Sequence, residues 1–196
     1  MASQPQLSSL AATRPSARSA VGWSAAALAG SVLLGLLGGL IWEQVAPRAT
    51  LQEISAGTAV LANAETRAYI TADAWFCGVA VVAGLLTGVL GYRFWVSVRT
   101  GAARALVVSC LILGGLAGAL VMAWIGEQIG RSGYDHHLAS SPDGTLFPDA
   151  LALGAKSALA FWPMATAIVL LVAEWATRTP ADPAGQAVPP GPGLTP

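Results

Sequence analysis

The sequence predicts an all-α, polytopic membrane protein whose four transmembrane helices form two tandem helical hairpins. Hydrophobic residues make up 55% of the 196 positions and charged residues only 10%, whereas a soluble domain carries about 25% charged residues. Four apolar segments are long enough to supply the roughly 20 residues that a helix needs to cross a bilayer. They cover residues 21–42, 74–95, 105–125 and 150–175, and tryptophans stand at their ends, as in the aromatic belts of membrane proteins.

The expected transmembrane domain covers residues 20–178, between two tails whose composition predicts disorder. The tails, 1–19 and 179–196, lie on the arginine-rich side of the four segments, and the longer loops 43–73 and 126–149 lie on the other side. The positive-inside rule therefore predicts cytoplasmic termini and two outer loops, in the plasma membrane. The first apolar run is too long for a cleaved signal peptide, so a retained signal anchor is expected.

Two similar stretches close the first and third segments, IWEQV at 41–45 and IGEQI at 125–129. Each is followed by an outer loop that ends with an aromatic residue and then Asp-Ala, in YITADA at 69–74 and FPDA at 147–150. The recurrence predicts two hairpins related by a pseudo-twofold axis along the membrane normal.

The repeat places four carboxylates at the outer ends of the helices. Asp73 and Asp149 are expected at helix N-termini, where a carboxylate caps free N–H groups and opposes the positive end of the helix dipole. Glu43 and Glu127 are expected at helix C-termini, where a negative charge is mildly unfavourable. Each of these glutamates is therefore either solvated or paired, with an arginine, with Lys156 or with a group outside the chain.

Two residues, a proline and a lysine, distinguish the fourth segment from the other three. Pro163 is expected in the middle of the helix, where proline produces a kink. Lys156 lies about a turn and a half inside the outer boundary, and an ionisable residue in a span is a candidate functional site. Its side chain either snorkels or pairs with Glu43, Glu127 or Asp149; it contacts a ligand or lipid headgroup; or it couples protons or ions. We take it as the strongest site candidate.

Small residues at helical spacing predict close helix packing, either inside the bundle or between copies. The clearest examples are Gly84, Gly88, Gly114 and Gly118.

The outer loops carry two further expectations. The alternating pattern of the first loop predicts a short β-hairpin with strands at 50–54 and 58–61, and an amphipathic helix on the membrane is the alternative. The second loop contains Asp135, His136 and His137, which form a weak metal candidate because their spacing matches no zinc signature. The sequence contains no recognisable catalytic motif, and no cofactor is expected.

Several stretches together resemble a family of small four-span actinobacterial membrane proteins of uncharacterised function. They are GLLGGLIWEQVAPR, TADAWFCGVAVVAGLLTGVLGYRFW, GEQIGR and LFPDALALGAKSALAFWPMA, within residues 25–175. The resemblance implies a membrane location and this topology, and it assigns no catalytic residue.

These observations favour a non-enzymatic accessory or scaffold protein that binds a partner complex of the cell envelope. Its expected partners are the lipid bilayer and another membrane protein or a second copy; the net charge of zero predicts no nucleic acid. The alternative is a small transporter or channel subunit that uses Lys156 with Glu43 or Glu127. An enzyme acting on a lipid or envelope precursor is the third possibility.

Overall fold

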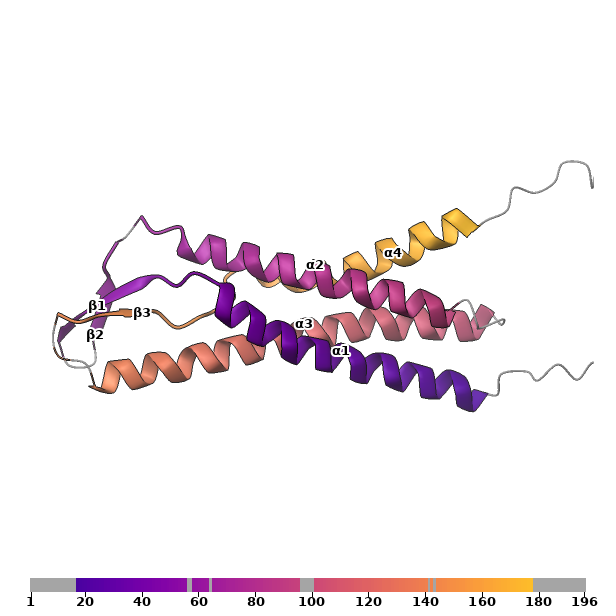
Figure 1. Cartoon of the computed structure of the whole chain (residues 1–196), viewed down its shortest axis with the longest axis horizontal. Helices are drawn as coiled ribbons and strands as arrows, with labels where there is room; N and C mark the ends of the chain where they lie inside the picture. Colours follow the sequence, from indigo (N-terminus) through magenta and orange to yellow (C-terminus); the bar gives the residue numbers. More distant parts are fainter. Residues whose placement is uncertain are drawn as a thin grey trace, which may run out of the picture.

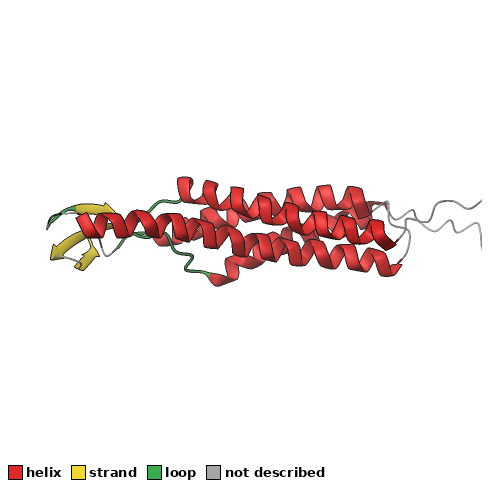
Figure 2. Cartoon of the chain, turned by 90° about the horizontal axis from the view of Figure 1, so that it is seen from below, coloured by secondary structure: helices red, strands yellow, loops and turns green. Residues whose placement is uncertain are grey.

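The computed structural model describes residues 17–55, 58–63, 65–95, 101–140, 142 and 144–177. Within them the chain forms the helices α1 (Ala17–Val45), α2 (Ala68–Trp95), α3 (Gly101–Ser140) and α4 (Phe161–Thr177), and a 3-10 helix, η1 (Lys156–Ala160), leads directly into α4. The helices run alongside one another, and a small sheet lies at the end of the bundle opposite the start of α1 and the end of α4 (Figures 1 and 2).

The prediction of an all-α, four-helix membrane protein is confirmed for the described part of the chain. Apolar stretches long enough to cross a membrane occupy Val21–Val45, Ala68–Arg93, Arg104–His136 and Lys156–Thr177. In the bundle, α1 packs most extensively on α3, and α2 packs on α4.

Helix α3 is longer than predicted. At 40 residues it measures about 60 Å, whereas the hydrocarbon core is about 30 Å thick, so one end of α3 extends well beyond the membrane. The expected loop from 126 onward is therefore wrong, since the helix continues to Ser140. The expectation that Glu127 stands at a helix C-terminus is wrong for the same reason, because Glu127 lies within α3. The chain becomes more polar after residue 126, but residues 127–141 contain no proline, so nothing in the sequence ends the helix where the polarity changes.

The fourth helix begins later than predicted. Residues 149–155 are not helical, η1 covers Lys156–Ala160, and α4 starts at Phe161. Pro163 is therefore the third residue of α4, and the expectation that it stands in mid-helix is wrong. Proline is well tolerated there because N–H groups in the first turn have no partner within the helix.

The sheet has the order β2-β1-β3 and is antiparallel, with β1 at Thr50–Ser55, β2 at Thr58–Leu61 and β3 at Leu146–Pro148. The predicted β-hairpin is confirmed, and its alternative, an amphipathic helix, is wrong. Strand β3 was not predicted, and it joins the segment between α3 and α4 to the segment between α1 and α2. Leu51 of β1 is buried and pairs with both Leu61 and Phe147. The Phe147 ring packs on Tyr134 of α3, with the ring centroids 5.8 Å apart.

The four glycines singled out for helix packing make close contacts inside the bundle. Gly35 of α1 lies directly against the backbone of Gly118, so an added Cβ there would overlap a carbonyl oxygen. A Cβ on Gly84 would lie 2.5 Å from the Trp162 carbonyl oxygen, one on Gly88 would lie 2.7 Å from Val169, and one on Gly114 would lie 2.9 Å from the Ser31 hydroxyl. Because these residues have no side chain, the helix backbones approach each other closely, as small-residue motifs allow in membranes.

Two tryptophans lie fully buried in the core. The Trp162 indole donates a hydrogen bond to the Thr87 hydroxyl at 3.2 Å, and the Trp42 indole donates to the Ala72 carbonyl at 2.8 Å. Trp42 also contacts Gly126, which holds the same place as Trp42 in the sequence repeat. A contact between equivalent residues is what a twofold axis between α1 and α3 would produce.

Candidate functional site

The polar groups predicted as site residues gather at the sheet end of the bundle (Figure 1), where residues 149–155 form neither helix nor strand. Two carboxylates bind three consecutive N–H groups of this segment. Glu127 of α3 accepts from the Leu153 N–H at 3.0 Å, and Asp73 of α2 accepts from the N–H groups of Gly154 and Ala155 at 3.1 and 2.9 Å. We call Glu127, Asp73 and the three N–H groups the carboxylate clamp.

The clamp gives Asp73 a different role from the predicted one. Asp73 is the sixth residue of α2, so it does not cap that helix. The N–H groups that it binds belong to Gly154 and Ala155, the two residues directly before η1. Asp73 therefore holds the backbone that leads into η1 and α4 from a neighbouring helix, where its charge also opposes the positive end of the helix dipole.

Asp149 is also not a helix cap, because α4 begins only at Phe161. One carboxylate oxygen accepts a hydrogen bond from the Tyr69 hydroxyl, and the other accepts from the Ala150 N–H at 2.7 Å. Its own N–H donates to the Ala49 carbonyl at 2.8 Å. Asp149 thus joins the end of β3 to the first turn of α2, which are about 80 residues apart in sequence.

The two glutamates of the repeated Glu-Gln pairs have different partners. Glu43 forms an ion pair with Arg48, and both side chains are largely buried. The Gln44 amide also donates to the Glu43 carboxylate at 2.6 Å. Glu127 has Lys156 at 3.9 Å, a long separation for an ion pair, and uses the same oxygen to accept from the Leu153 N–H.

Lys156 lies at the edge of the clamp with its side chain 74% exposed. Exposed pairs of this kind contribute between zero and about 1 kcal/mol. Of the alternatives given for Lys156, the geometry favours a side chain that snorkels or pairs loosely with Glu127.

The weak metal candidate lies on a helix rather than on a loop. Asp135, His136 and His137 are consecutive residues near the end of α3, so their Cβ atoms point in different directions around the helix. The side chain of His137 is outside the described set. Among the side chains that are described, no group of three or more His, Cys, Asp or Glu residues is placed to hold a metal ion.

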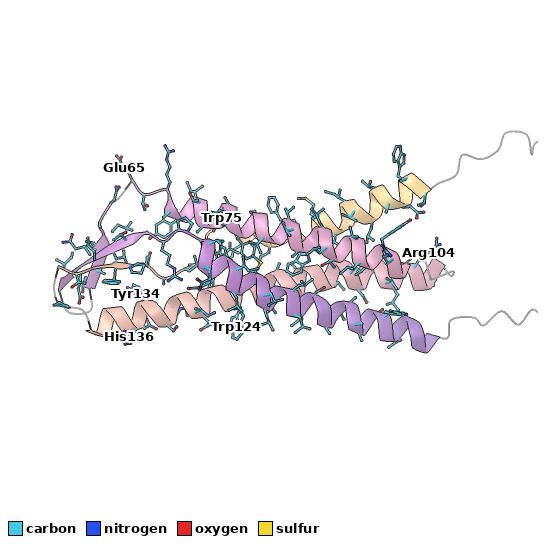
Figure 3. The ribbon with its side chains drawn as sticks, viewed as in Figure 1. Glu65, Trp75, Arg104, Trp124, Tyr134 and His136 are labelled. Atoms are coloured by element: carbon cyan, nitrogen blue, oxygen red, sulfur yellow. The ribbon has the colours of Figure 1, made fainter. Side chains whose placement is uncertain are left out.

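Figure 3 labels side chains at different positions along the long axis of the bundle. Arg104 lies at the end away from the sheet, and Tyr134 and His136 lie at the sheet end of α3. Exposed Trp75 and Trp124 lie between these levels on the surface of the bundle, where indoles near a headgroup region are expected.

The sheet exposes a cluster of aliphatic side chains that the sequence analysis did not single out. Ile54 is 58% exposed, Val60 is 45% exposed and Leu146 is 60% exposed. Gln52 pairs with both Val60 and Leu146, so these three residues form a cross-strand row on one face of the sheet. Ile54 is exposed beside this row, at the irregularity in the β1–β2 pairing between Glu53 and Ser55. We call Ile54, Val60 and Leu146 the outer-sheet patch. The alternation of polar and apolar residues in the first loop indicates that Ile54 and Val60 lie on a strand. Leu146 could not be added to the patch from the sequence, because it joins the sheet only by pairing with the distant strand β1.

The chain matches no protein-family model, no curated protein and no solved structure.

Proposed function

We propose that the chain is a non-enzymatic scaffold or accessory protein of the plasma membrane, which binds a partner protein of the cell envelope through the outer-sheet patch. The observation that carries the proposal is the exposure of Val60 and Leu146 on one face of the sheet, with exposed Ile54 beside them. Aliphatic side chains grouped outside the membrane are typical of interaction surfaces.

The patch is held in place before any partner binds. The opposite face of the sheet carries the buried side chains of Leu51, Glu53 and Phe147, and Phe147 packs on Tyr134 in the C-terminal part of α3. The Glu53 N–H donates to the Thr145 carbonyl at 3.1 Å, which ties β1 to the segment before β3. Preorganisation of this kind lowers the entropy that binding costs.

The size of the patch suits a moderate interaction. Complete burial of an exposed aliphatic side chain contributes about 1.5–3 kcal/mol. Because these three side chains are about half exposed, their burial would contribute about 3 kcal/mol, or about 100-fold in Kd.

The charged groups favour a structural role over transport. Glu43 is paired with Arg48, Glu127 and Asp73 bind the backbone of the 149–155 segment, and Lys156 is exposed at the outer end. These groups stabilise the outer end of the bundle, which supports the sheet.

Co-purification in a mild detergent tests the proposal. We expect wild-type protein to retain a stoichiometric partner and the double variant Val60→Ser, Leu146→Ser to lose it. Gln52→Ser is the matched control, because it changes a polar residue between the two and leaves the apolar area intact. Equal recovery of the partner with the double variant contradicts the proposal, as does a retained species that is only a second copy of the chain.

The proposed orientation places both termini in the cytoplasm and the sheet outside. Single cysteines introduced in a background without Cys77 and Cys110 test it in intact cells. We expect a cysteine at Ser132, which is exposed on the extended part of α3, to react with an impermeant maleimide. Cysteines at Ser3 and Thr195 are expected to be protected, and the reverse pattern contradicts the orientation.

A further inference from the structure

A groove of about 250 Å³ opens on the side of the bundle between α1 and α2, and α3 closes its floor. It exists because α1 packs mainly on α3 and α2 on α4. Direct contacts between α1 and α2 occur near the sheet, where Trp42 lies against Phe76 and a Cβ on Gly38 would lie 3.4 Å from Val79. Toward the opposite end the two helices separate, and the groove lies between them.

The lining of the groove is apolar. Small residues of α1, among them Ala27 and Gly30, form one wall, Leu90 of α2 forms the other, and Leu111 of α3 forms the floor. The hydroxyls of Ser31 and Thr87 also line the groove, but each donates to a carbonyl of its own helix, at 2.9 and 2.8 Å. This lining suits a hydrocarbon better than a polar ligand.

The length of the groove matches one leaflet of a bilayer. On α1 its lining runs from Trp23 to Leu34, twelve residues whose first and last Cα atoms lie about 16 Å apart along the helix axis. This length is about half of the 30 Å hydrocarbon core. Because the groove opens sideways, the hydrocarbon that meets it in a membrane is an acyl chain of that leaflet.

Basic residues stand at the end of the groove away from the sheet. Arg93 lies in the last turn of α2, three residues after Leu90 and so on the same side of that helix. Arg104 lies near the start of α3, seven residues before Leu111 and on the same face, at the bundle end seen in Figure 3. Trp23 lines the groove at this level, where an indole suits the headgroup region.

We propose that this groove binds one acyl chain of an anionic phospholipid from the leaflet opposite the sheet, with the headgroup near Arg93 and Arg104. The inference is independent of the outer-sheet patch, since the two surfaces lie at opposite ends of the bundle.

Gly30 offers a direct test, because an added Cβ at this position meets no atom within 4 Å. Gly30→Phe is therefore expected to fill the groove without disturbing helix packing. Gly22→Phe is the matched control, since Gly22 lies on the same helix, has the same open surroundings and does not line the groove. Each protein is reconstituted in vesicles of dioleoyl phosphatidylglycerol and dioleoyl phosphatidylcholine in equal amounts, then released for native mass spectrometry.

We expect wild type and Gly22→Phe to retain one phospholipid, with phosphatidylglycerol preferred, and Gly30→Phe to retain neither. Arg93→Gln is expected to keep a bound lipid but to lose about fivefold in headgroup preference. Retention by Gly30→Phe equal to wild type, or no retained lipid in wild type, overturns the proposal. Equal retention of the two lipids by wild type overturns its anionic part. A dimer that Gly30→Phe alone abolishes would make a second copy the occupant and would also overturn it.

A measurement on the unmodified chain complements the variants. Phosphatidylglycerol with a diazirine on one acyl chain is added to the same vesicles and activated by light. We expect the crosslinked peptide to contain residues 23–34 of α1, and crosslinks confined to other helices contradict the proposal even if Gly30→Phe fails to fold.

Discussion

Replacing Asp73 with alanine removes the carboxylate that binds the N–H groups of Gly154 and Ala155, at 3.1 and 2.9 Å. These two donors lie directly before η1, so the segment that leads into the fourth membrane-spanning helix loses the acceptor that holds its backbone. A hydrogen bond to a charged group contributes about 1.5–3 kcal/mol when it is shielded from water. Loss of an Asp cap costs about 1 kcal/mol, because water replaces part of the interaction.

The bonds of Asp73 are exposed to solvent at the sheet end of the bundle, so the free energy per bond is nearer to that of a helix cap. With two bonds lost and a favourable interaction with the helix dipole removed, Asp73→Ala is expected to lower the free energy of unfolding by about 2 kcal/mol. In a domain of this size such a change lowers Tm by about 4–8 °C. Asp73→Asn keeps one acceptor oxygen and should lie between alanine and wild type.

Thermal unfolding in detergent micelles, followed by size-exclusion chromatography with fluorescence detection, measures the effect. Asp149→Ala is the matched control, since this aspartate also lies at the outer end but binds the Tyr69 hydroxyl and its own neighbour instead of the start of η1. The control is expected to lose about half as much stability. If Asp73→Ala melts no lower than Asp149→Ala, the carboxylate clamp does not stabilise the start of the fourth span.

Two further substitutions test single features of the fourth span. Lys156→Met should change the free energy of unfolding by less than about 0.5 kcal/mol, because the Glu127 carboxylate is 3.9 Å away and the lysine side chain is mostly exposed. Thermal unfolding of Lys156→Met, with and without Glu127→Gln, measures the coupling between the two residues. A coupling energy above about 1 kcal/mol contradicts the prediction. Pro163→Ala should cost less than about 1 kcal/mol, because Pro163 lies in the first turn of α4; failure of this variant to accumulate in the membrane would show that the proline does more than start the helix.

Hydropathy and strand alternation were sufficient to predict much of the fold. The apolar spans are visible because a helix in lipid must present apolar side chains along its whole length. The strands at 50–54 and 58–61 were predictable because polar and apolar residues alternate on both sides of a turn, and the structure places them at Thr50–Ser55 and Thr58–Leu61.

The errors occur where contacts between distant segments decide the local structure. The end of α3 remains helical beside Phe147 and Leu151: Phe147 packs on Tyr134, and a Cβ on Gly130 would lie 2.7 Å from the Leu151 side chain. Strand β3 is only three residues long, too short to be recognised without its partner β1. Neither feature leaves a signal in the neighbouring residues.

The start of the fourth helix shows the same effect most clearly. An extended chain at a membrane boundary is costly when its N–H groups have no acceptor. Glu127 and Asp73 supply acceptors to Leu153, Gly154 and Ala155, so this segment can remain extended where its apolar composition predicted a helix. The acceptors come from α2 and α3, and their effect on residues 150–155 therefore cannot be found in those residues.

The two glutamates of the repeated Glu-Gln pairs hold equivalent positions in the repeat, but they make different contacts. Glu43 has Arg48 five residues later in the chain, and the pair is complete within the first hairpin. Arg131 occupies the corresponding region after Glu127, but α3 continues there as a helix, and Glu127 instead binds the backbone of the segment before η1. Asp73 of the first hairpin binds that same segment of the second. The second half of the chain therefore depends on a carboxylate of the first half for the start of its last helix, and the two hairpins are expected to unfold as one unit.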